Sequence, residues 1–503
     1  MTDTGYLLSI DQGTTSTRAL AFDHEHRILA SAQRPLGQHY PANGWVEHEP
    51  EEIWQATQAV MAEVVARMAE AGRQPMALGI TNQRETTLVW DRETGTPCHR
   101  AIVWQDRRTA AACEDLAASD GVAATVNRRT GLLLDPYFSA TKLKWLLDDP
   151  DGPRLRAGAE AGRLLFGTVE SFLVYRLTGG HAHVTDATNA SRTMLADIKT
   201  VQWSDEMLDL FAIPRPLLPR IVDCTETVGH VAEGLPAAGV PIAGLVGDQQ
   251  AASIGQACIR PGMVKSTYGT GCFVVQNTGA ELVYSRNRLL STVAYKTAAG
   301  VSYAMEGSIF NAGTVVQWCR DEMGFVADAA ETEAVAASIP DTGGVYLVPA
   351  FTGLGAPHWA PEARGLITGI TRDTGRAQMV RAGLESVAYQ TADLLGTLRR
   401  DGARPPAVVR IDGGMAANGW FARFLADVCN VPVERPASLE TTALGAALAA
   451  GVGVGLWADL DAAAEGWVRD SAFTPDMDPD RRAALLAGWQ QAMDQTLAPI
   501  RNG

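Results

Sequence analysis

The chain has 503 residues, 46% of them hydrophobic and 20% charged, which is typical of a globular protein long enough for two or three domains. Its formal net charge of −15 argues against broad binding to nucleic acid or to an anionic membrane surface, because both partners favour a basic face. The acidity does not exclude a local site for an anionic ligand such as a nucleotide, although its simplest interpretation is solubility.

The seven cysteines form no Cys-x-x-Cys pair, which predicts reduced thiols in the cytoplasm rather than a disulfide framework or a zinc site. No basic region followed by an apolar core stands at the N-terminus, so we expect no secretory signal. The longest apolar run, residues 443–458, is rich in Ala and Gly and too short to span a bilayer comfortably. We therefore expect a buried helix there and no membrane insertion.

The first half opens with strand-like segments followed by a helix. Pro50, Glu51 and Glu52 are typical of a helix start, and apolar residues then recur at helical spacing as far as Met68. The strands of this half are expected at residues 6–10, 17–22, 28–33, 76–81, 87–90 and 244–247.

The turn after the first strand has the composition of a phosphate site. Asp11 is followed by Gly13 and then by the hydroxyl residues Thr14, Thr15 and Ser16. Such a turn directs backbone N–H groups and small hydroxyls toward one point. Asp11 adds a carboxylate where a magnesium ion or its waters would lie. Gly/Thr turns also join ordinary strands, so this turn alone is weak evidence.

Two further charged positions stand next to predicted strands. In Arg84-Glu85, the arginine can donate to one hydroxyl of a small polyol while the glutamate accepts from another, although such a pair is more often solvated at the surface. Asp248 follows an apolar strand, where a carboxylate can accept a hydroxyl proton and direct that oxygen at phosphorus. Position alone favours the alternative that Asp248 caps a helix beginning at Gln249.

The second half repeats this pattern loosely, with a second Gly/Thr turn at Gly269-Thr270-Gly271. Two related turns indicate two similar domains facing a shared phosphate, and we place the domains at residues 1–253 and 254–503. Strands are expected at residues 263–266, 273–276, 345–350 and 408–411, and helices at 376–399, 421–428 and 443–450, the last capped by Thr441 and Thr442.

Several other residues have a functional and a structural interpretation. Asp412-Gly413-Gly414 ends a strand, and Asn418 follows at a helix start. The two glycines allow close approach of a flat ligand or its phosphates, but glycine pairs usually mark a sharp turn. Trp104 and Phe273 can form an apolar wall beside a substrate or belong to the core. The chain has no Walker-type Gly-x-x-x-x-Gly-Lys-Ser/Thr string, which argues against a P-loop kinase.

Together these strings resemble the FGGY carbohydrate kinase family, within the actin-like ATPase superfamily, nearly from end to end. In that family the string at residues 82–87, Asn-Gln-Arg-Glu-Thr-Thr, separates members that phosphorylate glycerol from the sugar kinases. The matching strings are residues 10–16, 44–48, 80–87, 102–105, 135–139, 247–250, 268–273 and 349–357.

The resemblance implies an α/β fold of two ribonuclease-H-like domains flanking a catalytic cleft, and transfer of a phosphoryl group from ATP to glycerol. Asp248 would be the base, and Asp11 would lie near Mg²⁺. The first domain would bind glycerol and the second the adenosine. Glycerol would contact Arg84, Glu85, Trp104, Tyr137, Asp248, Gln249 and Phe273. ATP would contact Thr14, Thr15, Ser16, Arg18, Thr270, Gly313, Gln317, Gly414 and Asn418.

The resemblance has one departure and leaves two alternatives open. Some bacterial members bind fructose 1,6-bisphosphate through a Gly-rich loop with an Arg, but residues 231–241 contain no Arg or Lys, and His230 lacks the flanks of a phosphorylated-histidine loop. We expect a cytoplasmic homo-oligomer, a dimer or tetramer. The alternatives are a kinase for another polyol or sugar such as xylulose, and an actin-like ATPase acting as a chaperone or filament, which would have no small-molecule pocket.

Overall fold

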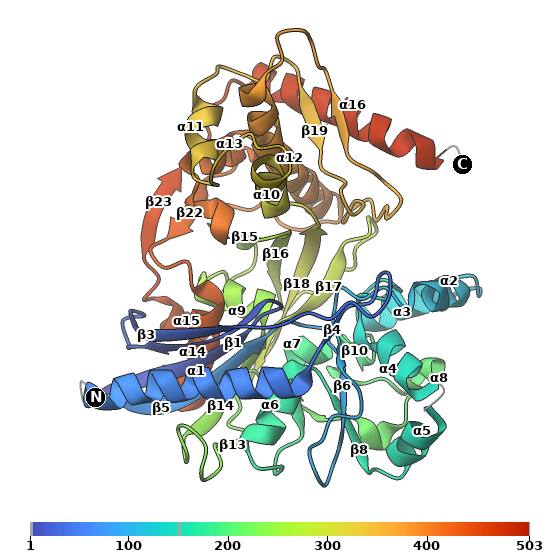
Figure 1. The fold of residues 1–503 in the computed structure, drawn as a ribbon, viewed down its shortest axis with the longest axis vertical. Coiled ribbons are helices and arrows are strands. Elements are labelled where there is room, and N and C mark those ends of the chain that lie inside the picture. Colours follow the sequence, from blue (N-terminus) through green and yellow to red (C-terminus); the bar gives the residue numbers. More distant parts are fainter. Residues whose placement is uncertain (1–3, 149–151, 502–503) are drawn as a thin grey trace.

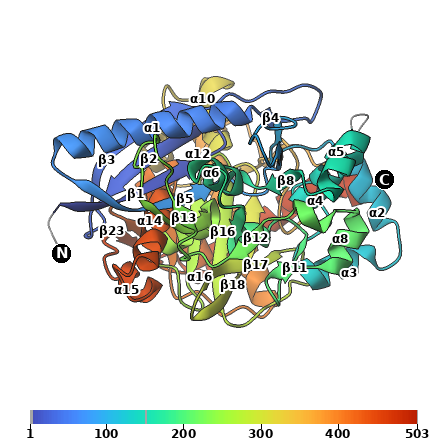
Figure 2. The ribbon, with the colours of Figure 1, turned by 90° about the horizontal axis from the view of Figure 1, so that it is seen from below.

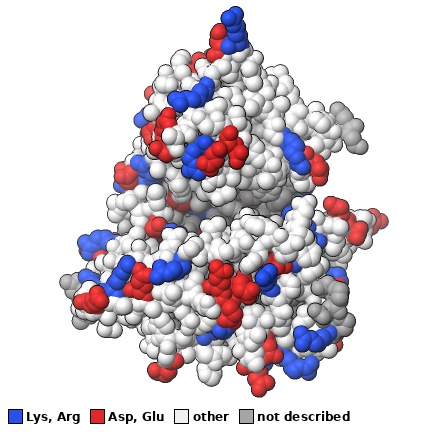
Figure 3. All heavy atoms as spheres, in the orientation of Figure 1, with Lys and Arg blue, Asp and Glu red and all other residues white. Residues whose placement is uncertain are grey.

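The structure is a computed structural model that describes residues 4–148 and 152–501. The chain forms two lobes (Figure 1): the lower one contains most of the first half of the sequence, and the upper one most of the second half. Helices and strands are mixed in both lobes, which confirms the expected α/β class. In the space-filling view the surface is hollowed between the lobes (Figure 3).

A six-stranded sheet forms the centre of the lower lobe. Its strands, in spatial order, are β13 (Gly229–His230), β14 (Pro241–Gly247), β5 (Gln74–Asn82), β1 (Gly5–Gln12), β2 (Ser16–Phe22) and β3 (Ile28–Pro35). β14, β5 and β1 are parallel, whereas β2 and β3 add an antiparallel extension. Nearly every residue of β1 is buried, because helices cover both faces of the sheet (Figure 2).

A seven-stranded sheet extends from the upper lobe toward the lower one. Its strands, in spatial order, are β17 (Leu290–Thr297), β18 (Gly300–Ile309), β16 (Cys272–Gly279), β15 (Val264–Tyr268), β21 (Val409–Asp412), β22 (Val433–Pro436) and β23 (Arg469–Phe473). β15, β21 and β22 are parallel, and the others pair antiparallel. The strand, Gly/Thr turn, strand arrangement of β1–β2 thus recurs in β15–β16.

Five two-stranded pairs complete the strands of the described residues. They are β4 (Glu47–His48) with β7 (Ala101–Ile102), β6 (Leu88–Asp91) with β8 (Leu164–Gly167), β9 (Val184–Asp186) with β12 (Arg220–Val222), β10 (Ala196–Asp197) with β11 (Gln202–Trp203), and β19 (Tyr346–Val348) with β20 (Leu366–Thr368).

The helices pack around these sheets. In the first half they are α1 (Pro50–Glu70), α2 (Ala110–Ala117), α3 (Val122–Thr130), α4 (Ser139–Asp148), α5 (Gly152–Glu160), α6 (Val169–Leu177), α7 (Ala187–Ala190), α8 (Asp205–Phe211) and α9 (Asp248–Gly255). In the second half they are α10 (Gly313–Asp321), α11 (Glu331–Ala337), α12 (Arg376–Arg400), α13 (Gly419–Cys429), α14 (Thr441–Gly453), α15 (Leu460–Ala464) and α16 (Pro479–Arg501). Short 3₁₀ helices lie at Arg215–Leu217 and Gly414–Ala417.

The helix α14 belongs to the second half of the sequence but packs on the first sheet, against β14, β5 and β1. The approach is very close, since a Cβ atom at Gly79 would lie 2.1 Å from the carbonyl oxygen of Ala446. Glycine at this strand position therefore lets the helix backbone touch the sheet. The boundary near residue 253 stays a prediction, and α14 connects the two halves across it.

The sequence prediction of a buried helix in the apolar run is confirmed, because α14 is buried along most of its length. Across the described ranges, no helix combines the length and apolar character needed to cross a bilayer. The predicted caps are wrong: Glu440 stands at the N-cap without a side-chain bond, and Thr441 is the first helical residue. The Thr441 hydroxyl donates instead to Asp412 at 2.6 Å.

The predicted strands and helices coincide with elements of the structure, including β1, β5 and β14 in the first half and α12 and α13 in the second. Several elements were not predicted, among them α10, α11, α15, α16, β22 and β23. Two larger regions were also missed. Residues 101–222 form α2–α8 and several short strands, and residues 290–309 form the long antiparallel strands β17 and β18. The second region contributes directly to the site described next.

Candidate active site

The first group of site residues lies at one edge of the lower sheet. Gln12 at the end of β1 pairs with Asn82 at the end of β5, which pairs with Gly247 at the end of β14. The carboxyl ends of three parallel strands therefore coincide, as they do where α/β sheets bind ligands. This register brings together the first phosphate turn, the Arg84-Glu85 pair and Asp248, although they are far apart in sequence.

Arg84 and Glu85 are buried, each side chain being 2% exposed, so the surface-pair interpretation is wrong. The Arg84 guanidinium Nε lies 3.1 Å from Asp248 Oδ1. Glu85 has a left-handed φ of 61°, unusual for a residue with a Cβ. Its carbonyl oxygen accepts a hydrogen bond from the Ser139 hydroxyl at 3.0 Å, which helps hold this conformation.

Asp248 is the first residue of α9, and its Oδ1 accepts a hydrogen bond from the backbone N–H of Gln249 at 2.7 Å. Its side chain is 29% exposed, so the carboxylate is accessible where its arginine neighbour is not. Burial raises the pKa of Asp248 to about 6, and the positive charge of Arg84 opposes part of that rise. A carboxylate with this pKa is suited to accept a proton near neutral pH.

Gln249 is held by a residue that the sequence did not single out. The Lys265 ammonium on β15 donates to Gln249 Oε1 at 2.5 Å, and both side chains are buried. Burial lowers the pKa of Lys265, while the nearby carboxylates of Asp412 and Asp248 oppose the change. Because the carbonyl oxygen of Gln249 is occupied, its amide N–H₂ is the group left to donate to a ligand.

Three aromatic rings adjoin the charged residues. Trp104 packs edge-on against Tyr137, with centroids 5.6 Å apart, and against Phe273, with centroids 6.4 Å apart. The Arg84 guanidinium lies 5.9 Å from the centroid of Phe273. The Trp104 indole N–H donates to the hydroxyl of Thr14 at 2.9 Å, which joins the aromatic group to the first turn. Trp104 and Phe273 are half-buried rather than core residues.

The first phosphate turn is closed by a hydrogen bond from Gly13 N–H to the Ser16 carbonyl oxygen at 2.9 Å. Thr15 is exposed, and Thr14 and Ser16 are half-buried, so these hydroxyls reach the surface. The Arg18 guanidinium is shared between the carboxylates of Asp11 and Glu440.

The second turn is built on close backbone packing. A Cβ at Gly271 would lie 2.6 Å from the carbonyl oxygen of Ile309, and one at Gly313 would lie 2.5 Å from that of Gly269. Gly313 N–H donates to that Gly269 oxygen at 2.9 Å. The turn is thus fixed against the start of α10, with Thr270 exposed at its tip.

The remaining predicted nucleotide contacts lie on α10 and in the segment after β21. Gln317 is exposed on α10, and Gly414 is exposed at the turn after β21. Asn418 caps α13: its side-chain oxygen accepts from Phe421 N–H at 2.9 Å, and its amide donates to the hydroxyl of Thr332 at 3.2 Å. Asn418 is half-buried, with both functional groups of its side chain already bonded.

Within the described residues, no group of three or more His, Cys, Asp or Glu side chains is arranged to hold a metal ion. Mg²⁺ in phosphoryl-transfer sites is bound by one or two carboxylates, by water and by the phosphates of the substrate. Asp11, which is buried except for 5% of its surface, therefore fits as a single carboxylate toward such an ion. Its present partner is Arg18.

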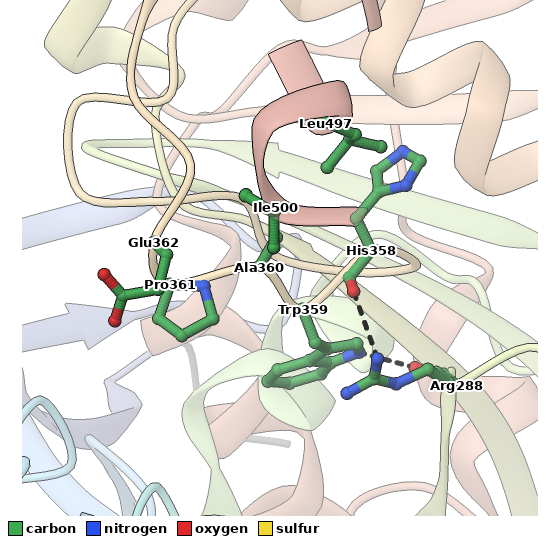
Figure 4. Close-up of a pocket in the computed structure, with 8 residues that line it drawn as sticks. All are labelled: Arg288, His358, Trp359, Ala360, Pro361, Glu362, Leu497 and Ile500. Atoms are coloured by element: carbon green, nitrogen blue, oxygen red, sulfur yellow. Dashed lines mark hydrogen bonds between the residues drawn. The ribbon is translucent and has the colours of Figure 1, made fainter. Parts of the chain in front are cut away.

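A separate pocket of about 280 Å³ lies between the end of α16 and the segment around Trp359 (Figure 4). Its walls are mostly apolar, and the Trp359 indole N–H donates to the carbonyl oxygen of Arg288 at 2.7 Å. It shares no residue with the set described above.

Comparisons with known proteins identify the family and the fold. Residues 6–255 match the N-terminal domain, and residues 264–454 the C-terminal domain, of the FGGY family of carbohydrate kinases. A glycerol kinase of Rhodospirillum centenum is 58% identical over 490 residues, which cover 97% of this chain and 98% of the relative. The crystal structure of Plasmodium falciparum glycerol kinase with ADP has a TM-score of 0.92 at 37% identity and covers 98% of both chains. A xylulose kinase from Lactobacillus acidophilus has a TM-score of 0.88 at 22% identity, covering 98% of both chains, a likeness of fold alone. The expected two-domain fold is confirmed.

Proposed function

Because the chain belongs to the FGGY family of carbohydrate kinases, we propose that it transfers the γ-phosphoryl group of ATP to glycerol, giving sn-glycerol 3-phosphate. The observation that carries the proposal is the accessible Asp248 carboxylate, 3.1 Å from the buried Arg84 and next to Glu85. Full-length relatives named glycerol kinase support the choice of substrate.

The acceptor alcohol is bound by the charged and aromatic residues at the sheet edge. Arg84 donates to one hydroxyl, Glu85 accepts from another, and the Gln249 amide and the Tyr137 hydroxyl complete the polar contacts. Trp104 and Phe273 pack on the carbon chain. This combination suits a small polyol, whose hydroxyls need directional partners and whose CH groups need an apolar surface.

Asp248 orients the reacting hydroxyl and receives its proton. The hydroxyl oxygen forms a bond to the γ-phosphorus while the bond from that phosphorus to the β,γ-bridging oxygen breaks, and ADP leaves. An alcohol is far less acidic than a carboxylic acid, so the proton moves to Asp248 late, after the loose transition state is reached, and then passes to water.

The triphosphate lies between the two Gly/Thr turns. Backbone N–H groups and hydroxyls of the first turn, with Thr270 and Gly313 of the second, offset the charge on the phosphates. Mg²⁺ bound to ATP near Asp11 supplies further neutralisation of phosphate charge. The complete proposed nucleotide set is Thr14, Thr15, Ser16, Arg18, Thr270, Gly313, Gln317, Gly414 and Asn418. The reduced thiols predicted from the cysteine pattern are why we place the enzyme in the cytoplasm, and a dimer or tetramer remains our expectation.

A coupled assay of ADP release tests the proposal, with glycerol, xylulose and a panel of other polyols as acceptors. We expect glycerol to exceed a pentulose in kcat/KM by about 10²-fold or more, because a site that bonds each substrate hydroxyl discriminates strongly. Equal activity on a pentulose would contradict glycerol as the substrate. ATP hydrolysis unaffected by every polyol, together with polymerisation, would favour an actin-like filament instead.

A further inference from the structure

A buried carboxylate from the second half of the chain contacts the proposed glycerol-binding arginine. Glu306 lies in the middle of β18, paired with Val275 on one side and Leu290 on the other. Its side chain is fully buried and accepts from Arg84 Nη1 at 2.6 Å and Arg84 Nη2 at 3.1 Å. Arg84 is therefore held by two parallel bonds to a strand of the other sheet, a geometry of high directional specificity.

A second buried arginine completes this contact. Arg192, which follows α7 and is fully buried, donates from Nη2 to Glu306 Oε1 at 3.0 Å and from Nε to Glu85 Oε1 at 2.6 Å. Its guanidinium also lies 5.5 Å from the ring centroid of Tyr137. One guanidinium thus bridges the two carboxylates, and it adjoins a third residue of the acceptor site.

The four side chains Arg84, Glu306, Arg192 and Glu85 together carry no net charge, and Arg84 also contacts Asp248. Burial alone would raise the pKa of Glu306, but Arg192 and Arg84 outweigh it and hold that pKa at about 2. Well-packed apolar residues would stabilise a core as well as such a buried network does, because desolvation offsets most of the attraction. The position of this network beside the proposed acceptor site therefore favours a role in geometry over a role in stability.

We propose that Glu306 and Arg192 are positioning residues for the acceptor alcohol. They fix the guanidinium of Arg84 and the carboxylate of Glu85 in the orientations that bind the glycerol hydroxyls, and so set discrimination against alcohols that lack one hydroxyl. The inference rests on the proposed function. It adds that the acceptor groups of the first half are oriented by β18 of the second half.

The network leaves specific groups available to a ligand. Glu306 accepts from one N–H on each Nη of Arg84, Gln250 Oε1 accepts from Nη1 at 3.2 Å, and within the described residues the second N–H of Nη2 is left for a ligand. Arg192 occupies Glu85 Oε1, and Glu85 Oε2 has no hydrogen-bond partner in the described part of the chain. Rotation of the Arg84 or the Glu85 side chain would break at least one charge-assisted bond in a buried site. Such rigid placement is what a binding site needs to hold its ligand groups within a fraction of an ångström.

The variants Glu306→Gln and Arg192→Lys test the proposal. Glu306→Gln keeps the shape but removes the charge, and Arg192→Lys keeps the charge but cannot bridge two carboxylates with a planar fork. We expect each to raise the KM for glycerol about tenfold or more while the KM for ATP changes less than about twofold, since only the acceptor groups lose orientation. The preference for glycerol over propane-1,2-diol, measured as a ratio of kcat/KM values, should fall about tenfold.

The matched controls are Glu385→Gln and Arg381→Lys. This buried pair on α12, with Nε and Oε1 2.8 Å apart, has the same chemistry but is not part of the proposed site. These variants should lower the thermal unfolding midpoint without changing the glycerol KM or the diol preference. The proposal is overturned if Glu306→Gln and Arg192→Lys behave in the same way. If Glu306→Gln does not fold, the kinetics of Arg192→Lys alone test the proposal. If neither variant folds, the network is required for folding, and this result also contradicts the positioning role. Absence of glycerol phosphorylation in the unmodified protein would instead overturn the proposed function.

Discussion

The acceptor end and the nucleotide end of the proposed site are built differently. At the acceptor end, Arg84, Glu85 and Glu306 are charged, buried and connected by ion pairs between the two halves of the chain. At the nucleotide end, Thr15 and Thr270 are uncharged and exposed on short turns between neighbouring strands.

The difference between the two ends shows which residues determine the geometry of each. A turn such as Gly269-Thr270-Gly271 is local, so its shape follows from adjacent residues and from glycines that permit close packing. The acceptor end depends on partners distant in sequence, because Arg84 and Glu306 are 222 residues apart. We therefore expect substitutions at the acceptor end to affect glycerol, and substitutions at the turns to affect ATP.

The largest effect is expected from Asp248→Asn. The amide cannot receive the hydroxyl proton, so kcat should fall about 10²–10⁴-fold while glycerol still binds. Steady-state kinetics with ATP and glycerol measure both quantities. Asp393→Asn is the matched control, because burial also raises the pKa of Asp393 to about 6, but this residue lies on α12 and bonds Trp489. Near-normal turnover of Asp248→Asn would remove Asp248 from the role of base.

The next largest effect is expected from Arg84→Ala. Loss of charge-assisted bonds to the substrate should raise the glycerol KM about 10–100-fold with little change in the KM for ATP. The variant should also be less stable by as much as about 3–5 kcal/mol, because Glu306 loses one of its two buried partners. Kinetics and thermal unfolding with Arg381→Ala as the reference separate these effects. An unchanged glycerol KM would place Arg84 outside the site.

Gly313→Ala tests whether the second turn affects the binding of ATP and not that of glycerol. The new Cβ would lie 2.5 Å from the Gly269 carbonyl oxygen, so the second turn must move. We expect the KM for ATP to rise about tenfold, the effect of roughly 1–2 kcal/mol of strain, with the glycerol KM unchanged. Gly396→Ala is the control, since its Cβ would meet only Arg400 Nη1 at 3.6 Å. A glycerol defect equal to the ATP defect would contradict the division of roles.

The smallest effect is the dependence of activity on pH. The pKa of Asp248 is raised to about 6, and the base must be unprotonated, so kcat/KM for glycerol should be constant above this value and fall below it. The expected loss is about tenfold for each pH unit once the carboxylate is mostly protonated. Rates between pH 5 and 9 measure it at saturating ATP. The residual activity of Asp248→Asn should not fall at low pH in this way. If the variant still loses activity below pH 6, the titrating group is not Asp248.

Local patterns explain which parts of the site could be predicted. The Asp11 turn and the Gly271 turn were visible as strand, glycine and hydroxyl strings, and the residues of β1, β5 and β14 were visible as apolar runs. The resemblance then connected Arg84 and Asp248, which position alone assigned to a surface pair and a helix cap. The cap interpretation of Asp248 is wrong, because Gly247 is the N-cap of α9 and Asp248 is its first helical residue, whose carboxylate contacts Arg84.

The residues that were missed share a cause. Glu306 and Lys265 are single charges inside strands, and Arg192 lies in the turn after the short helix α7, with no recognised motif around any of them. One signal was available: a lone carboxylate in the apolar run of β18, at residues 303–309, is costly to bury without a partner. Its partner could not be named, because an ion pair depends on the distance between folded elements.

By itself, the sequence determined the strands around the two glycine-rich turns, since these follow from hydrophobic periodicity and from backbone requirements within a few residues. The family followed from the resemblance of its motif strings. The tertiary structure alone decided that Glu306 and Arg192 contact Arg84 and Glu85, and that α14 joins the second half to the first sheet. The physical reason is that buried charges and close helix contacts are satisfied by whichever groups packing brings within about 3 Å, and sequence separation places no limit on that choice.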